Sequence, residues 1–209
     1  MDHLYEQLTA LKLTGFRDAL KKQLAQPGTY QELGFEERLS LLTAEELTCR
    51  ENRKAERLIK HARFRLNAEL SKLDYRNNRG LDRALIRSLS QGNWLTLKQN
   101  ILLTGATGSG KTFLACALGH NACRQGYKVY YYRLKALMEQ CYQGHADGRY
   151  SKLLTRLNNS DLLLLDDWGL EPLSSEQRSD LLEIVDLMYQ RGSIIVVSQL
   201  PVENWYKMI

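Results

Sequence analysis

A glycine-rich loop in the middle of the sequence carries the residue types that bind phosphate. Residues 105–112 read Gly-Ala-Thr-Gly-Ser-Gly-Lys-Thr, which fits the pattern G-x-x-x-x-G-K-T. Glycines let backbone N–H groups curl around an anion, because they tolerate positive φ and have no Cβ. A helix that begins near Lys111 would add the positive end of its dipole. We therefore expect Lys111 to reach the β- and γ-phosphates of a nucleotide.

Two further groups of polar residues would complete such a site. Residues 162–167 read Leu-Leu-Leu-Leu-Asp-Asp, an apolar strand that ends in two acids about 55 residues after the loop. The first acid, Asp166, is expected to hold Mg²⁺ together with the hydroxyl of Thr112. The second, Asp167, is expected to orient the attacking water, although a loop acid or helix cap would look the same. The residues expected to contact the nucleotide are Gly105, Ala106, Thr107, Gly108, Ser109, Gly110, Lys111, Thr112 and Phe113.

A polar pair, Ser198 and Gln199, follows the next apolar run at 194–197. The amide of Gln199 could touch the γ-phosphate or the attacking water, so we count it with Lys111 and Asp167 as a candidate catalytic residue. The alternative is a polar pair that ends a strand without touching a ligand. The argument depends on all three groups lying at the carboxyl ends of parallel strands, where ligands bind in open α/β sheets.

The elements that must position these residues alternate along the second half of the chain. Apolar runs at 100–104, 128–132, 162–165 and 194–199 predict strands, and the segments 111–125, 134–159 and 174–190 between them predict helices, with Ser174 as an N-cap. Continuous apolar strands separated by helices indicate an α/β fold, a parallel sheet covered by helices on both faces.

The first half of the chain is predicted to be helical. Leucine spacing indicates helices over 3–26, 31–47 and 44–72, and a linker around 74–80 precedes a short helix over 81–89. We therefore expect a small all-α domain over residues 1–75 and a nucleotide-binding core over residues 76–209.

Positive charge is concentrated in the first half. Residues 1–98 hold 18 Lys/Arg and 13 Asp/Glu, whereas residues 99–209 hold 11 of each. On a helix, six side chains near residues 50–61 fall on one face and small or aliphatic residues fall on the other. Such a basic face suits a phosphate backbone, although an ordinary solvated face is the alternative. A membrane-surface helix is disfavoured because the apolar face lacks Trp. The predicted DNA-contacting residues are Arg50, Arg53, Lys54, Arg57, Lys60 and His61.

The composition also bears on where the protein is located and on whether its cysteines bind a metal. No apolar run approaches the roughly 18 residues of a membrane span, and the N-terminus carries acids where a signal peptide has bases. We therefore expect a cytoplasmic protein without a membrane partner. The four cysteines show no C-x-x-C spacing, which argues against a cysteine metal site and for reduced thiols.

At this point the residues resemble a known family. The phosphate loop, Leu-Asp-Asp-Trp-Gly at 165–169 and Ser-Gln-Leu-Pro-Val at 198–202 are similar to IstB-type transposition helper ATPases, as are Leu-Asp-Arg-Ala at 81–84 and the start at 8–13. These are AAA+ proteins similar to the DnaC helicase loaders. The resemblance implies ATP binding, homo-oligomers on duplex DNA with little sequence preference, and a transposase partner during target selection. It also implies that Gln199 holds the sensor-1 position.

The sequence departs from the wider AAA+ pattern in two respects. The acid pair is Asp-Asp, whereas Asp-Glu is usual, and the shorter side chain of Asp167 predicts slow hydrolysis. The chain stops at Ile209, before the lid that carries the sensor-2 arginine and before the arginine finger, so the lid subdomain is expected to be missing and neither arginine is assigned.

Three other functions remain open from the sequence. A helicase loader of the DnaC type shares the core and differs only in its partner. A P-loop kinase would need an arginine-rich substrate lid and a small acceptor. A DNA-binding scaffold with a purely structural ATP site would show no turnover.

Overall fold

The computed structural model describes residues 2–75 and 81–207, so most of the predicted linker around 74–80 lies outside the described residues. The chain divides into two compact units, Met1–Glu56 and Arg57–Ile209. The division falls inside helix α4 (Phe35–Ala62), whereas the sequence suggested a boundary at residue 75. Each unit is described by itself.

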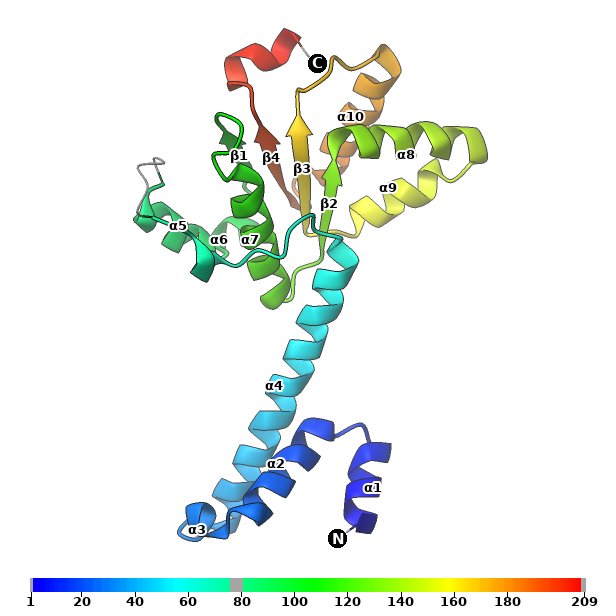
Figure 1. Ribbon diagram of the computed structural model, residues 1–209. Helices are drawn as coiled ribbons and strands as arrows, with labels where there is room; N and C mark the ends of the chain where they lie inside the picture. Colours follow the sequence, from blue (N-terminus) through cyan, green and yellow to red (C-terminus); the bar gives the residue numbers. More distant parts are fainter. Residues whose placement is uncertain (1, 76–80, 208–209) are drawn as a thin grey trace. The chain divides into compact units, whose positions relative to one another are not determined.

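The first unit consists of α1 (Asp2–Ala10), α2 (Thr14–Ala25), α3 (Pro27–Tyr30) and the larger part of α4 (Figure 1). The single helix predicted over 3–26 is wrong, because Lys12 adopts φ +58° and breaks it into α1 and α2. Residues in this left-handed region cannot continue a right-handed helix. The helices predicted over 31–47 and 44–72 are instead one helix of 28 residues.

Helix α4 ends ten residues earlier than predicted. Its last residue is Ala62, and Arg63 then adopts φ +56°. Leu66 and Leu70 therefore lie beyond the helix, and Leu70 begins the 3₁₀ turn η1 (Leu70–Lys72). The apolar face of this part of α4 is formed by Ala55, Leu58, Ile59 and Ala62, which are buried or half-buried.

Helices α2 and α4 pack closely and are joined by a buried carboxylate. A Cβ on Gly15 would lie 2.7 Å from Cys49 Cβ, so only glycine allows this approach. Leu13, the residue at the N-cap of α2, makes no capping hydrogen bond with its side chain. The N–H of Phe16 instead donates to Glu46 Oε2 at 3.1 Å, and Arg50 donates to Glu46 Oε1 at 2.7 Å. Glu46 therefore supplies from α4 the acceptor that the first turn of α2 needs.

The second unit is built on a four-stranded sheet, and the α/β prediction is confirmed. The strands are β1 (Ile101–Thr104), β2 (Val129–Arg133), β3 (Leu162–Trp168) and β4 (Ser193–Ser198). Their order is β1-β4-β3-β2, and every pair is parallel. All carboxyl ends therefore meet at one edge of the sheet (Figure 1).

Helices cover both faces of the sheet, because successive residues of a buried strand point to opposite sides. Leu162 and Leu164 pack with α7 (Lys111–Arg124) and with the α5 (Arg83–Ser90) and α6 (Asn93–Thr96) region. Leu163 and Leu165 pack against the other layer, which comprises α8 (Leu134–Asp147), α9 (Tyr150–Asn158) and α10 (Ser175–Met188). A 3₁₀ helix, η2 (Val202–Lys207), follows β4.

The predicted N-cap at Ser174 is confirmed. Ser174 caps α10, and its hydroxyl and the side chain of Gln177 form a reciprocal capping box. Gly148, at φ +73°, separates α8 from α9, whereas Gly144 lies within α8 and does not break it. Within the described residues, no helix combines the length and the apolar character that crossing a membrane requires.

Candidate functional site

The phosphate loop joins β1 to α7 and contains glycines with positive φ. Gly108 and Gly110 have φ of +77° and +92°, which favours glycine. A Cβ on Gly108 would meet nothing within 4 Å, so the space beside the loop is open to a ligand. Helix α7 begins at Lys111 directly after the loop, so its first N–H groups face this space.

The ammonium of Lys111 lies inside the loop. Its Nζ donates to the carbonyl oxygens of Gly105 at 2.8 Å and Ala106 at 2.7 Å, and it lies 3.3 Å from Ser109 Oγ. These neutral acceptors hold the cation where an anion would be seated. The side chain of Lys111 therefore faces into the loop.

Thr112 and Asp166 are brought together across the sheet. Thr112 Oγ1 donates to Asp166 Oδ1 at 3.2 Å. Neighbouring ligands of octahedral Mg²⁺, each about 2.1 Å from the metal, lie about 2.9 Å apart. The two oxygens are therefore spaced much as two adjacent Mg²⁺ ligands would be, and an alcohol plus a carboxylate is a donor set that suits this ion.

Asp166 is held in one orientation by three donors. Besides Thr112, Tyr131 Oη donates to Asp166 Oδ2 at 2.7 Å, and the N–H of Asp167 donates to Asp166 Oδ1 at 2.9 Å. The carboxylate is 1% exposed. Burial, and then the bond to Asp166, raise the pKa of Tyr131 above its ordinary value, so the phenol keeps its proton and remains a donor.

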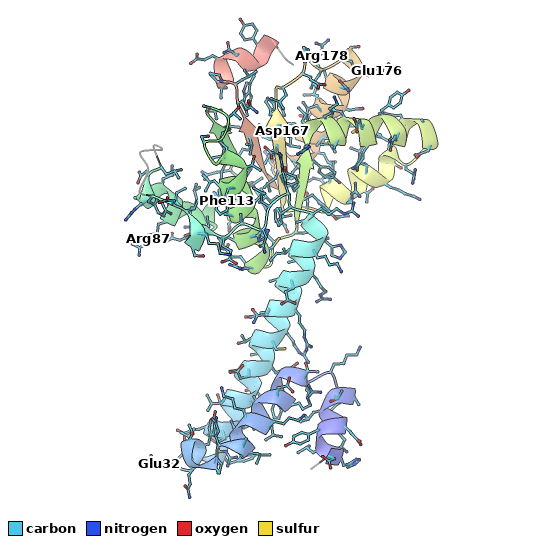
Figure 2. The ribbon with its side chains drawn as sticks, viewed as in Figure 1. Glu32, Arg87, Phe113, Asp167, Glu176 and Arg178 are labelled. Carbon is cyan, nitrogen blue, oxygen red and sulfur yellow. The ribbon has the colours of Figure 1, made fainter. Side chains whose placement is uncertain are left out.

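Asp167 sits on a bulge of β3. It lies near the carboxyl end of this strand (Figure 2). The register between β3 and β4 shifts between Leu165 and Trp168, and Asp167 adopts φ +58°. Bulges next to active sites re-aim side chains, and Asp tolerates this conformation better than most residues. The strand was predicted to end at the acid pair, but it continues to Trp168. The carboxylate of Asp167 faces two arginines, Arg133 Nε at 3.4 Å and Arg65 Nη1 at 3.7 Å.

The two polar residues at the end of β4, Ser198 and Gln199, make different contacts. Ser198 is fully buried, and its hydroxyl donates to the carbonyl of Trp168 at 2.9 Å, a structural bond. Gln199 turns toward the phosphate loop, where its Oε1 accepts a hydrogen bond from Thr107 Oγ1 at 2.6 Å. Of the two, only Gln199 is directed toward the loop.

Two hollows flank the loop and share Gly110, Lys111 and Phe113. One, of about 400 Å³, contains Asp166, Asp167 and Gln199. The other, of about 580 Å³, lies beside β1 and is partly apolar through Leu73 and Leu81. The first carries the charged groups that phosphates and a metal ion need, and the second offers the apolar surface that a nucleobase needs.

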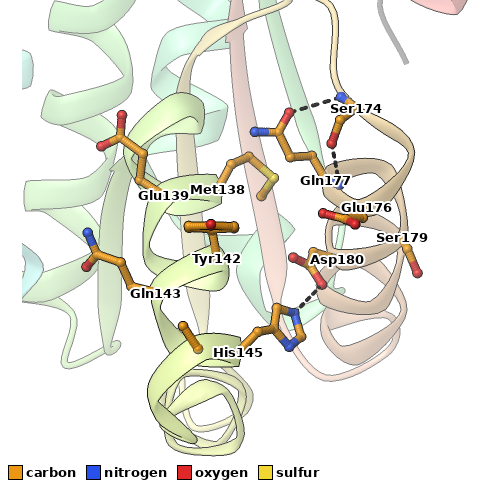
Figure 3. A pocket seen from close by; sticks show the side chains of 11 residues that line it. Met138, Glu139, Tyr142, Gln143, His145, Ser174, Glu176, Gln177, Ser179 and Asp180 are labelled. Carbon is orange, nitrogen blue, oxygen red and sulfur yellow. Dashed lines mark hydrogen bonds and ion pairs between the residues drawn. The ribbon is translucent and has the colours of Figure 1, made fainter.

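A larger hollow, about 920 Å³, lies between α8 and α10 and is unsuited to phosphates (Figure 3). Glu139 lines it from α8 and Glu176 from α10, and His145 Nε2 lies 2.9 Å from Asp180 Oδ1 across it. No Lys or Arg is among its lining residues. Because like charges repel, this acidic groove is not where a nucleotide would be held.

The six predicted DNA-contacting residues all lie on α4 and are exposed; they are Arg50, Arg53, Lys54, Arg57, Lys60 and His61. Some of them also have contacts within the protein. Arg50 binds the buried Glu46, and Arg53 donates to Thr14 Oγ1. The surplus of positive charge does not extend over the whole first half of the chain. Residues 1–56 hold 8 Lys/Arg and 10 Asp/Glu, whereas residues 57–98 hold 10 Lys/Arg and 3 Asp/Glu.

Three residues near the acid pair were not predicted for the site: Tyr131, Arg133 and Arg65. The parallel register pairs Arg133 with Asp166, so a correct strand alignment could have found it. Tyr131 lies two residues earlier on the same strand. No local sequence signal connects Arg65 to Asp167.

Together, the loop, the opposed Thr112 and Asp166, and the parallel sheet define a P-loop nucleotide-binding protein. The profile of the IstB-like ATP-binding proteins matches residues 6–209, nearly the whole chain. The chain therefore belongs to the IstB-like ATP-binding family, and the resemblance inferred from the sequence is confirmed.

Known proteins agree with this assignment. The chain is 46% identical over 200 residues to the ATP-binding protein of insertion sequence IS1162 from Pseudomonas fluorescens, covering 95% of this chain and 86% of the relative. It is 42% identical to the insertion-sequence ATP-binding protein y4pL of Sinorhizobium fredii strain NGR234, covering 98% and 83%.

Solved structures place the fold among the AAA+ proteins. The DnaC helicase loader superposes with a TM-score of 0.57 and 28% identity over 65% of this chain and 78% of that one. DnaA from Aquifex aeolicus, bound to AMPPCP, superposes with a TM-score of 0.61 and 22% identity over 68% and 45%. The second likeness concerns the fold alone.

Proposed function

We propose that this protein is an ATPase that binds duplex DNA in an ATP-dependent manner and assists a transposase in selecting or using an insertion site. The observation that carries the proposal is the pairing of Thr112 with Asp166, 3.2 Å apart, beside a loop whose lysine faces inward. Membership of a family of insertion-sequence ATP-binding proteins supports it.

The cofactors we propose are ATP and Mg²⁺. The loop residues 105–113 would cradle the phosphates, and the hollow beside Leu73 and Leu81 would receive the base. Thr112 and Asp166 would hold Mg²⁺, which neutralises charge on the β- and γ-phosphates when bound. Tyr131 keeps Asp166 oriented, because its hydroxyl occupies the carboxylate oxygen that Thr112 does not.

Hydrolysis is the reaction we assign to the acid pair. Asp167 would orient the attacking water, and Gln199 would contact that water or the terminal phosphate. Both residues line the hollow that contains Lys111. Asp167 is one methylene shorter than the usual glutamate and is held by two arginines, so turnover is expected to be slow and to depend on DNA or a partner.

DNA binding is assigned to the exposed basic face of α4. It carries cations on successive turns, and residues 57–98 have a surplus of seven positive charges, 10 Lys/Arg minus 3 Asp/Glu. Contacts of this kind go to phosphates and carry no sequence information, so the proposed binding has little sequence preference.

Assembly into a homo-oligomer is the third part of the proposal. In the first unit, Phe35 is 80% exposed, Leu11 65% and Leu47 62%. An assembly that covered these side chains would remove apolar surface from water. We propose residues 1–75 as the DNA-contacting and oligomerisation region and the remainder as the nucleotide-binding core, with ATP favouring the assembled state.

A helicase loader is the second candidate, and the likeness to DnaC favours it. It shares the nucleotide chemistry and differs in partner. Retention of the cognate transposase on the immobilised protein, with no retention of a hexameric replicative helicase, would support the first proposal. The reverse pattern would support the second.

The substitution Lys111→Ala tests the nucleotide part. Removing the ammonium should abolish detectable ATP binding and, with it, any ATP-dependent gain in duplex affinity, while the fold is retained. Arg156→Gln on α9 also loses one positive charge and serves as the control. Unchanged ATP affinity in the Lys111→Ala variant, measured by fluorescence titration, would contradict the assignment of the site.

A further inference from the structure

Arg65 stands out because it joins the nucleotide site to the basic helix. Its Nη1 lies 3.7 Å from Asp167 Oδ2 and 4.0 Å from Asp166 Oδ2. It lines the same hollow as Lys111 and Gln199. Helix α4 ends at Ala62, so only two residues separate the end of that helix from Arg65.

The backbone that carries Arg65 is anchored on α7. Phe64 packs so tightly on this helix that a Cβ on Gly119 would lie 2.5 Å from its ring, and the ring lies 4.4 Å from that of His120. Further along, Ala68 is fully buried and Glu69 pairs with Arg124 of α7 at 3.3 Å. Since α7 begins at Lys111, the segment is fixed to the helix that carries the phosphate loop.

The guanidinium of Arg65, in contrast, is held loosely. Both of its carboxylate contacts are longer than hydrogen bonds, and its side chain is 43% exposed. Its attraction to the acid pair is therefore mainly electrostatic. The planar fork remains suited to two parallel hydrogen bonds with a phosphate group.

Binding of a magnesium triphosphate would change the charges around this guanidinium. Mg²⁺ would compensate the charge of Asp166, which weakens the attraction that holds Arg65 over the acids. A terminal phosphate would offer it a stronger, bidentate partner. ADP lacks that phosphate, so the two nucleotides would leave Arg65 with different partners.

We propose that Arg65 contacts the terminal phosphate of ATP and reports its presence to α4. This inference rests on the proposed function, because it deepens the assignment of the same site. Arg65 lies five residues after Lys60 and four after His61, so its position bears on the end of α4 that carries these two side chains. Arg133 is closer to Asp167, but it belongs to β2 and not to the segment that follows α4.

The test compares triphosphate and diphosphate affinity in Arg65→Gln, Arg65→Lys and the control Arg156→Gln. Calorimetry with Mg²⁺ and either AMPPNP or ADP gives both constants. Loss of a charge-assisted contact should weaken AMPPNP binding on the order of 10- to 100-fold and leave ADP binding within about twofold. Arg65→Lys keeps the positive charge but lacks the planar guanidinium, so its AMPPNP affinity should lie between those of the wild type and Arg65→Gln. Equal losses for both nucleotides, or no loss, would show that Arg65 is only a counter-ion of the acid pair.

A second measurement separates this inference from the function on which it rests. Duplex affinity of each variant is measured without nucleotide and at saturating AMPPNP. Arg65→Gln should keep its nucleotide-free affinity and lose most of the gain that AMPPNP gives. A preserved gain would overturn the link to α4. If the wild type itself shows no gain, the proposed function fails, while the AMPPNP-to-ADP ratio still decides whether Arg65 contacts the terminal phosphate.

Discussion

The basic face of α4 gives a quantitative prediction about salt. We choose Lys54, Arg57 and Lys60 for substitution by glutamine. Arg50 and Arg53 are left intact because they bind Glu46 and Thr14, and their loss would disturb the packing of α2. Glutamine has nearly the helix propensity of lysine and arginine, so α4 should persist.

The expected size follows from counterion release. Each lost phosphate contact lowers the slope of log K against log salt by about 0.9, so three contacts lower it by about 2.7. If the two proteins bind DNA equally at 1 M salt, the triple variant would bind about 500-fold more weakly than the wild type at 0.1 M and about 80-fold more weakly at 0.2 M. The deficit thus shrinks about sixfold when the salt concentration is doubled.

Fluorescence anisotropy with a random-sequence duplex, at saturating AMPPNP and over a series of salt concentrations, measures this slope. A second duplex of unrelated sequence should give the same result. The control variant replaces Lys128, Lys152 and Arg156 by glutamine, which removes the same charge from exposed positions of the second unit. If both triple variants reduce the slope equally, the effect comes from net charge, and the assignment of α4 as the DNA-contacting surface is refuted.

Two other substitutions test separate parts of the account. Asp167→Asn keeps a residue that tolerates φ +58°, and should retain ATP and duplex binding while turnover falls about 100-fold or more; wild-type turnover would show that Asp167 does not orient the water. For Glu46, burial raises the pKa, but hydrogen bonds from Arg50, Phe16 and Gly15 outweigh it, so the pKa lies below 4.5. Its contribution to stability is therefore present above pH 4.5 and is lost as the pH falls through the lowered value. Glu46→Gln should lower the melting temperature at pH 6, and the difference from wild type should shrink below pH 4.5; a difference that does not change with pH, or an equal loss in the exposed neighbour Glu45→Gln, would contradict this.

Sequence reasoning succeeded where local patterns decide the structure. The phosphate loop requires glycines at fixed positions, and short apolar runs such as 162–165 between helical segments favour buried strands. The capping box at Ser174 is likewise local, because it involves only the four consecutive residues 174–177. The parallel sheet then brings Thr112, Asp166 and Gln199 to one edge without further information.

The remaining features depend on contacts between distant residues. The end of α4 at Ala62 is fixed by Phe64, which packs against Gly119 far along the chain. The bulge at Asp167 reflects how β3 pairs with β4. Arg65 joins the site only because this anchored segment passes the carboxyl end of β3, and helical periodicity continued through residue 72 predicted the opposite. Tertiary packing thus determines these three features, which local propensity does not predict.

The central claim is that a triphosphate in the loop controls association with DNA. Light scattering coupled to size separation, applied to the wild-type protein with and without duplex in ATP plus Mg²⁺ and in ADP plus Mg²⁺, tests it directly. We predict larger assemblies and retained duplex with ATP, and dissociation with ADP. The same mass and the same amount of bound duplex in both nucleotides would contradict the account.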